Sequence, residues 1–373
     1  MTRPRLRLLH ETNPEKYFPA LYELARRGRV DLVGAHRYSV GKEWVRAGLR
    51  DRTPLGQRSR NAWGDFLFRL RAPFVRGEVI VIGFAPWDWR LLIYRHLARH
   101  NRILYQTSWH DWRFDKTPRQ PKPPLFRRYM QRQWLRFLHQ PNVAAIAVTP
   151  KVAQSVTAET GVQPVVIPHS LPDFFFNVSK ELHHRKDDRL RLIYVGELSE
   201  KKGLRQLLHI ANMLKGQGVT LSVVGTGPLA AQVQQAGDNV TFLGPIRDRT
   251  TLAQLMTEQD VLMLLSQRTE AWEELFGIVI IEALASGLAV LATDHVGPRQ
   301  ILEPCGGAGL FAEDDLDGVL AQLQRFVDHP HTVADLVQKQ AQVAQAYRIE
   351  TVMAAWMDMI DPVSAESDQE ASE

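Results

Sequence analysis

The chain has 373 residues, of which 45% are hydrophobic, and a formal net charge of +5. This length exceeds one ordinary core and suits two domains, and the hydrophobic content is typical of a soluble globular protein rather than a disordered one. A single cysteine, Cys305, excludes an intrachain disulfide and favours a reducing compartment. The sequence also lacks a signal-peptide segment and any apolar run long enough to cross a membrane, so we expect a cytoplasmic protein.

The net charge conceals a strong asymmetry between the two halves. Residues 1–186 hold 33 Lys and Arg against 14 Asp and Glu, whereas residues 187–373 hold 13 against 27. A basic half favours an anionic partner, such as a membrane surface, a nucleic acid or a phosphorylated lipid. A surface that is merely well solvated is the alternative, and it remains open at this point.

Short apolar runs alternate with helical patterns in the first half. Strands are expected at residues 78–84, 102–107, 142–149 and 164–168, and a helix at residues 89–99. Buried parallel strands have such continuous apolar runs, and alternation of strands with helices is typical of an α/β fold. We therefore predict a Rossmann-like domain over residues 1–180, which a polar linker at 177–191 joins to the next.

The alternation is more regular in the second half, which predicts a second Rossmann-like domain over residues 188–344. The expected strands lie at residues 190–195, 219–224, 240–243, 260–265 and 288–292, and the helices at about 250–258, at 203–215 and at 277–286. A long helical segment follows at residues 315–360. The acidic residues 361–373 are poor in large apolar side chains and are expected to be disordered.

Two carboxylates eight positions apart give the strongest functional signal. Glu274 precedes a Phe-Gly step, and Glu282 lies eight residues, or about two helical turns, beyond Glu274 in the apolar stretch IVIIEALA. The free N–H groups at Gly277 and Ile278 would form an anion site for a diphosphate. Glu282 would accept hydrogen bonds from a ribose diol, as an acidic residue does in dinucleotide folds, and Glu274 would face the sugar.

Two glycine-containing loops support a phosphate-binding function. A strand ends at Gly196, and Lys201 and Lys202 follow just before the glycine that opens a helix. An ammonium at this position would neutralise charge on a leaving phosphate. The turn made by Gly225 and Gly227 permits a close backbone approach to a ligand, although no full G-x-G-x-x-G motif occurs in the chain.

Together and in this order, these segments resemble glycosyltransferase family 4 over about residues 190–315. The resemblance implies a GT-B fold of two facing Rossmann-like domains with parallel sheets, in which helix 345–360 packs on the N-terminal domain. It implies a metal-independent retaining glycosyltransferase, hexosyltransferase-like, that uses a UDP- or GDP-linked sugar and no other cofactor. The acceptor would be a glycan or a lipid-linked molecule, in cell-surface polysaccharide or glycolipid synthesis.

The resemblance also assigns roles to individual residues. Lys202 matches the family's phosphate-binding lysine, and Glu274 and Glu282 match its paired glutamates. His110 and Asp111 match a His-Asp step, whose histidine lies near the transferred sugar. Glu197 stands where the family has an arginine that contacts the diphosphate; we expect Lys201 to substitute for it.

Residues 122–140 form a basic amphipathic segment with two open interpretations. Phe126, Met130, Trp134, Phe137 and Leu138 share one helical stripe, and Arg127, Arg128, Arg132 and Arg136 lie mostly off it. Such a helix suits the cytoplasmic face of an anionic membrane, where Phe126, Trp134 and Phe137 would insert. Alternatively, the stripe packs onto the first domain, as most amphipathic helices do.

Two alternatives to an active transferase follow from particular features. Glu197 suggests a catalytically degenerate protein that binds sugar nucleotides, and the basic half suggests a nucleic-acid-binding protein. No nucleic-acid-binding motif supports the second alternative, and the acidic half would repel a phosphate backbone. The Asp315-Leu316-Asp317 segment lies at an expected helix start, where acidic residues cap, so no metal site is predicted.

Overall fold

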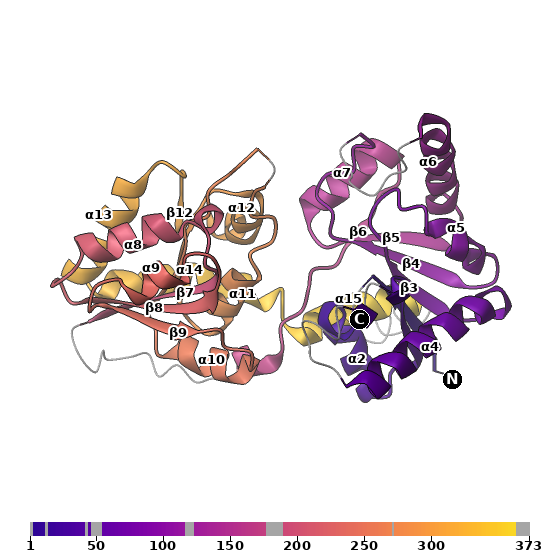
Figure 1. The fold of residues 1–373 in the computed structure, drawn as a ribbon, viewed down its shortest axis with the longest axis horizontal. Helices are drawn as coiled ribbons and strands as arrows, with labels where there is room; N and C mark the ends of the chain where they lie inside the picture. The colour runs from indigo at the N-terminus through magenta and orange to yellow at the C-terminus, as the bar shows by residue number, and fades with distance from the viewer. Residues whose placement is uncertain are drawn as a thin grey trace, which may run out of the picture. The chain divides into compact units, whose positions relative to one another are not determined.

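The structure, a computed structural model, describes residues 3–11, 14–41, 44–45, 54–115, 123–176, 189–270 and 272–362. The chain divides into two compact units, one formed by Met1–Ser170 with Ile349–Glu373 and the other by Leu171–Arg348. Each unit contains a six-stranded sheet in which all strand pairs are parallel (Figure 1). The predicted α/β class with two Rossmann-like domains is confirmed. Most of the predicted linker, residues 177–188, and nearly all of the predicted disordered tail, residues 363–373, lie outside the described residues.

The sheet of the first unit has the strand order β2-β1-β3-β4-β5-β6. Its strands are β1 (Arg5–His10), β2 (Asp31–Arg37), β3 (Val79–Gly83), β4 (Arg102–Thr107), β5 (Val143–Ala147) and β6 (Val165–Val166). The helices of this unit are α1 (Pro14–Tyr17), α2 (Pro19–Arg26), α4 (Leu55–Arg71), α5 (Leu91–Tyr94), α6 (Pro124–Leu138), α7 (Pro150–Thr160) and α15 (Ile349–Ile360).

The first strand escaped prediction because it carries charges in the middle of a sheet. In β1 the Arg7 guanidinium donates to Glu78 from Nε at 2.6 Å and from Nη2 at 3.0 Å, and Arg5 Nη2 lies 3.2 Å from the same carboxylate. Glu78 is buried, so this network satisfies charges that would otherwise oppose burial.

The helix predicted at residues 89–99 is shorter than expected. The α-helix α5 ends at Tyr94, and a 3₁₀-helix continues over Arg95–Arg99. Side-chain amides bind the carbonyls at its end, since Asn101 Nδ2 donates to Leu97 O at 2.8 Å and Asn142 Nδ2 donates to Ala98 O. These amides replace the backbone donors of a longer helix.

The sheet of the second unit has the strand order β12-β11-β10-β7-β8-β9. Its strands are β7 (Leu190–Glu197), β8 (Val219–Thr226), β9 (Val240–Gly244), β10 (Val261–Leu264), β11 (Ala289–Thr293) and β12 (Leu310–Phe311). Its helices are α8 (Leu204–Met213), α9 (Ala230–Gln234), α10 (Arg249–Thr257), α11 (Ile278–Ala285), α12 (Val296–Leu302), α13 (Leu316–Asp328) and α14 (His331–Gln345), with 3₁₀ turns at Glu200–Lys202 and Glu303–Cys305.

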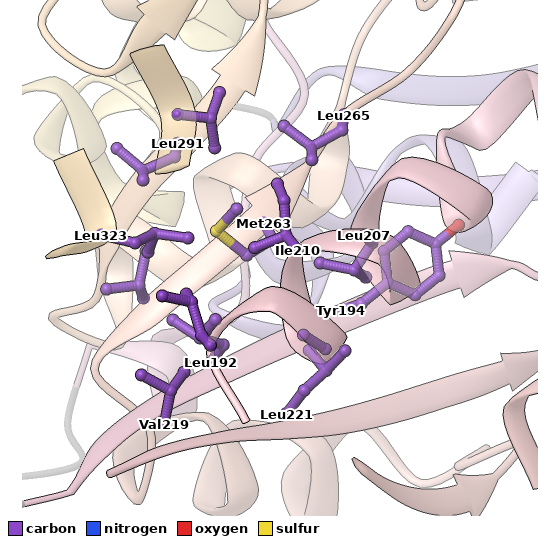
Figure 2. Packing of buried hydrophobic residues seen from close by; sticks show 14 of the residues in the cluster. Leu192, Tyr194, Leu207, Ile210, Val219, Leu221, Met263, Leu265, Leu291 and Leu323 are labelled. Atoms are coloured by element: carbon purple, nitrogen blue, oxygen red, sulfur yellow. The ribbon is translucent and has the colours of Figure 1, made fainter. Parts of the chain in front are cut away.

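Alternating side chains of the second sheet form two apolar layers. One layer contains Leu192, Tyr194 and Met263, on which Leu207 and Ile210 of α8 pack (Figure 2). The neighbouring strand residues face the other layer, against α11. Burial on both faces explains the continuous apolar runs that predicted these strands.

The long helical segment predicted at residues 315–360 is three helices. Pro330 follows α13 and cannot continue its hydrogen-bonding ladder. Between α14 and α15 the backbone turns, and Tyr347 O accepts a hydrogen bond from Leu171 N at 2.8 Å. None of the helices in the described part of the chain has the length and apolar content needed to cross a bilayer.

The C-terminal helix α15 belongs to the core of the first unit. It packs against α2, and its buried residues include Val352, Met353 and Trp356. The Trp356 ring lies edge-on to Phe18, with centroids 6.1 Å apart. A segment from the far end of the sequence therefore completes a core that begins with β1.

We expect Trp356→Ala to destabilise the first unit by about 3–5 kcal/mol, since it removes a buried aromatic ring and leaves a cavity. Urea unfolding, followed by circular dichroism, measures the loss. Asp358→Ala, on the exposed face of the same helix, is the matched control and should change little. Equal unfolding midpoints for the two variants would show that α15 contributes no such packing.

Candidate functional site

The second sheet reverses its winding direction between β7 and β10. Strands β8 and β9 extend from one side of β7, whereas β10, β11 and β12 extend from the other. The connections from β7 to β8 and from β10 to β11 therefore run in opposite directions across the sheet. The carboxyl edge at such a switch point is where open α/β sheets bind ligands.

The loops after β7 and β10 are in direct backbone contact. Gly203 has a φ of +71°, and a Cβ at this position would lie 1.7 Å from the Leu265 carbonyl oxygen. Gln267 N also donates to Lys201 O at 2.8 Å. Only glycine permits this approach, which brings the loop of Lys201 and Lys202 (the lysine loop) beside the segment that leads to Glu274.

Lys202 and Glu274 form an ion pair at this contact. The Lys202 ammonium binds Glu274 Oε2, and both side chains are largely buried. Ser266 Oγ, which is fully buried, donates to the same oxygen at 3.4 Å. The structure thus unites two predicted residues that lie 72 positions apart in the sequence.

A buried histidine that the sequence did not identify holds the Glu274 backbone. His295 Nδ1 accepts a hydrogen bond from Glu274 N at 3.1 Å, so its Nε2 carries the proton and donates to Ser266 O at 2.8 Å. Gly297 N donates to Glu274 O at 2.9 Å. A Cβ on Gly297 would lie 2.5 Å from Phe276 N, so the α12 backbone supports the Glu274 segment closely.

An aromatic ring lies beside the two predicted lysines. The ammonium groups of Lys202 and Lys201 lie 4.8 Å and 5.4 Å from the centroid of the Trp272 ring. Cation–π attraction of this kind orients an ammonium without neutralising it. The position of Trp272 in the sequence does not indicate that it contacts these lysines, so only the folded structure could identify it.

Lys201 is paired with the residue that replaces the family arginine. Its Nζ lies 3.0 Å from Glu197 Oε2, and both side chains are partly exposed. The charge of Lys201, which we predict to contact the diphosphate, is therefore partly offset by a neighbouring carboxylate.

Glu282 lies in α11 and is only 4% exposed. Arg249 Nη2, from the start of α10, lies 2.6 Å from Glu282 Oε1, and the guanidinium also lies over the Phe175 ring at 5.1 Å. Burial raises the pKa of Glu282, and Arg249 offsets part of this rise. Arg249 is thus a partner of the predicted ribose-binding carboxylate that the sequence did not identify.

The N-terminus of α11 begins at Gly277, whose φ of +65° is left-handed, and no side chain caps it. Ile278, the first helical residue, is exposed. The first N–H groups of this eight-residue helix and its dipole therefore remain directed at the space before it. This geometry suits an anion, as predicted for Gly277 and Ile278.

Two of the three other predicted glycines, Gly225 and Gly227, have a packing role. A Cβ on Gly225, whose φ is +147°, would lie 1.8 Å from the Gly196 carbonyl oxygen. A Cβ on Gly227 would lie 2.4 Å from Leu198 O. Close contact between the ends of β7 and β8 is enough to require glycine at 225 and 227.

His110 lies in the first unit, in the loop after β4, whereas the other predicted site residues lie in the second unit. The adjacent Asp111 binds Arg113, with Oδ2 2.7 Å from Nη2, and this guanidinium lowers the pKa of Asp111. The described geometry therefore groups Lys202, Glu274 and Lys201 but assigns His110 to a separate domain.

The predicted membrane insertion of the α6 aromatics is wrong for Trp134 and Phe137. Both rings are buried, as are Met130 and Leu138, because the stripe packs into the first unit. Trp134 Nε1 also donates to Asp88 O at 3.0 Å. Of the predicted insertion residues only Phe126 is exposed; the basic face, with Arg128, Arg132 and Arg136, is exposed as well.

The predicted role of Asp315 as a helix cap is confirmed, since its side chain accepts a hydrogen bond from Gly318 N at 2.9 Å. Among the residues that the structure describes, no group of three or more His, Cys, Asp or Glu side chains is arranged to hold a metal ion.

The pKa shift of Glu282 predicts a pH dependence of stability. A carboxyl group whose pKa is higher in the folded state than in the unfolded state stabilises the fold at a pH below both pKa values. This stabilisation is lost as the pH rises through the folded-state pKa. Glu282→Gln removes this titration. The free energy of unfolding of the variant, relative to the original chain, should therefore increase between about pH 4 and pH 7.

Urea unfolding across this pH range measures the difference. Glu258→Gln replaces an exposed carboxyl after α10 and is the control for the general effect of a Glu-to-Gln substitution in the same unit. A difference that decreases as the pH rises would contradict the assignment.

The family comparison matches the part of the chain that carries this site. Residues 176–343 match the model of the family described as glycosyl transferases group 1. The chain is 28% identical over 236 residues to phosphatidyl-myo-inositol mannosyltransferase of Mycolicibacterium smegmatis, a match covering 62% of this chain and 60% of the relative. It is 30% identical over 169 residues to GDP-mannose-dependent alpha-mannosyltransferase of Mycobacterium tuberculosis, covering 45% and 40% of the two chains. The matches thus span less than two thirds of these relatives.

Solved structures are similar over nearly the whole chain. WaaG, a glycosyltransferase involved in lipopolysaccharide biosynthesis, aligns with a TM-score of 0.60 at 17% identity, over 95% of this chain and 99% of WaaG. Sucrose-phosphate synthase from Thermosynechococcus elongatus aligns with a TM-score of 0.63 at 17% identity, over 98% and 100%. These likenesses confirm the predicted fold, and the sequence matches do not favour the degenerate or nucleic-acid-binding alternatives. Residues 176–343 therefore match the family described as glycosyl transferases group 1, within a chain whose two domains have the GT-B fold.

Proposed function

We propose that the chain is a retaining glycosyltransferase that moves a sugar from a UDP- or GDP-linked donor to a glycan or lipid-linked acceptor. The Lys202–Glu274 ion pair, at the switch point of the second sheet and near the uncapped start of α11, carries this proposal. A cation, an anion-binding helix end and a carboxylate are the groups that a sugar diphosphate requires.

Donor binding would exchange partners within the ion pair. The diphosphate would sit at the N–H groups of Gly277 and Ile278 and draw the Lys202 ammonium from Glu274. The released Glu274 carboxylate would then accept hydrogen bonds from the donor sugar. Glu282 would accept from the ribose diol, since a carboxylate offers two oxygens and Arg249 lies against one of them.

Transfer would take place on one face of the sugar. The bond between the anomeric carbon and the phosphate oxygen breaks as the acceptor oxygen bonds to the same carbon. The leaving phosphate oxygen takes the proton of the acceptor hydroxyl, while Lys202 and the α11 N-terminus stabilise the developing negative charge. His110 of the first unit would contact the transferred sugar, and no metal ion is required.

The first unit would receive the acceptor at the cytoplasmic face of a membrane. This unit contains most of the basic residues of the chain, and anionic phospholipid attracts Lys and Arg. The mycobacterial relative is named for the transfer of mannose to phosphatidyl-myo-inositol, which is a lipid. Cell-surface polysaccharide or glycolipid synthesis would be the corresponding process.

Lys202→Ala and Glu274→Ala should each lower kcat by roughly 100–1000-fold, because each removes a charged contact to the transition state. The measurement is sugar transfer, or donor hydrolysis where the acceptor is unidentified, with circular dichroism to verify the fold. Lys215→Ala, which removes an exposed lysine paired with Asp238 elsewhere in the unit, is the matched control. Unchanged turnover in both site variants would refute the catalytic assignment.

The Glu197–Lys201 pair supports a second candidate, a protein that binds donor but transfers slowly. Glu197 places a negative charge 3.0 Å from a lysine that would otherwise face the diphosphate. Glu197→Gln should tighten nucleotide-sugar binding by up to about fivefold, since an exposed ion pair of this kind contributes about 1 kcal/mol or less.

Thermal-shift titration with UDP- and GDP-sugars and the free nucleotides measures this effect and identifies the base, because a ligand of the folded state raises the melting temperature. Glu200→Gln, which removes an exposed carboxylate paired with Arg205 in the same loop, is the control. Weaker binding by the Glu197 variant would show that this carboxylate assists the donor site. Donor binding with no transfer or hydrolysis would favour the second candidate.

A further inference from the structure

Helix α4 carries a row of large apolar side chains on its outer face. The helix buries Asp65 and Phe68 against the first unit. On the opposite face it exposes Leu55, Trp63, Phe66 and Leu70, and Phe74 continues the row just beyond the helix. Trp63 is 62% exposed and Phe74 is 78% exposed. Single exposed apolar residues are ordinary, but a contiguous row of them marks an interaction surface.

From Trp63 onward the row is continuous because its members follow helical spacing. Residues 63, 66 and 70 are three and four positions apart and share one face, and the rings of Trp63 and Phe66 stack with centroids 5.6 Å apart. Trp44 extends the face sideways, since its indole N–H donates to Ser59 Oγ at 3.3 Å and Arg58 lies 4.4 Å from its ring.

The exposed charges of the segment that carries this row have one sign. Residues 54–77 contain five arginines, Arg58, Arg60, Arg69, Arg71 and Arg76, and one acidic residue, Asp65. Asp65 is buried and accepts a hydrogen bond from Arg37 N at 3.1 Å, so it does not offset the surface charge. Arg60, Arg71 and Arg76 are exposed. At helical spacing, Arg60 and Arg71 lie to one side of the apolar row and Arg58 to the other.

An exposed aromatic row with an arginine border suits a lipid surface. The rings reach the boundary between head groups and acyl chains, and the guanidinium groups remain at the level of the phosphates. Helix α6 offers a useful contrast, because its stripe of Met130, Trp134 and Phe137 is already buried within the unit. Of these two basic helices, α4 presents the longer exposed apolar row.

We propose that this α4 face, defined by Leu55, Trp63, Phe66, Leu70 and Phe74, docks onto an anionic phospholipid membrane. The basic border fits a surface of continuous negative charge, whereas a second copy of the chain would place like charges opposite each other. The inference names a membrane as the partner of the first unit. It rests on the proposed function only because that function treats the acceptor as lipid-linked.

The test is co-sedimentation of the full chain with phosphatidylcholine vesicles, with and without phosphatidylglycerol, at low and high salt. The chain should bind the mixed vesicles at low salt and dissociate as the salt increases. Trp63→Ser with Phe66→Ser should weaken binding at least about tenfold, through the loss of buried apolar surface. Arg60→Gln with Arg71→Gln should weaken it about fivefold per arginine at low salt.

Matched variants on α6 distinguish the two helices. Leu125→Ser with Tyr129→Ser removes two exposed apolar residues of α6 and should leave binding unchanged. Leu70→Ser with Phe74→Ser is a second α4 variant, in case Phe66 contributes to folding; melting temperatures verify each protein. Vesicle binding that survives both α4 variants, or that the α6 variant abolishes, would overturn the proposal. So would a dimer that the Trp63 and Phe66 substitutions dissociate.

Failure of this inference differs from failure of the proposed function. Glu274→Gln should bind vesicles as the original chain does. If the chain binds vesicles but no nucleotide sugar, the transferase proposal fails and the docking surface stands. If it binds donor but no anionic vesicle, the docking proposal fails and the transferase proposal stands.

Discussion

The contact between the loops after β7 and β10 organises the second unit. At Gly203 the lysine loop meets the carbonyl of Leu265 at a distance that leaves no room for a Cβ, and Gln267 N binds Lys201 O across the same contact. Strand order places these loops side by side at the carboxyl edge, and the glycine allows them to touch. The meeting of Lys202 with Glu274 depends on this approach.

The ion pairs of this unit differ in electrostatic strength because they are buried to different extents. Lys202 and Glu274 are mostly shielded from water, and Ser266 and His295 fix the carboxylate and its backbone. A shielded charge interacts more strongly with an incoming diphosphate than an exposed one does. The pair of Lys201 and Glu197 is more exposed, so water screens the interaction between its charges.

The basic helices α4 and α6 show why amphipathic pattern alone does not define a surface. Both carry arginines and aromatic residues at helical spacing. In α6 the aromatic stripe faces the core, where Trp134 is fully buried and bonded to Asp88 O. In α4 the core takes Phe68 and Asp65 instead and leaves Trp63 and Phe66 in solvent. A sequence reports the spacing of apolar residues, but the neighbouring elements decide which face is covered.

The sequence by itself determined the α/β class and most strands of both sheets, and it predicted Lys202, Glu274 and Glu282 as site residues. These features are local: buried parallel strands require continuous apolar runs, and an anion site at a helix start requires a glycine entry and nearby charged residues. Strand β1 escaped prediction because its arginines are neutralised by Glu78, which lies in a distant segment.

The tertiary structure decided which residues meet. His295, Arg249 and Trp272 reach the candidate site from separate loops and helices, and no spacing within the sequence signals them. It also gave Gly225 and Gly227 a packing role and divided the C-terminal helical segment, with α15 completing the first unit. Each of these outcomes depends on contacts between residues far apart in the chain, and such contacts exist only once the backbone has folded.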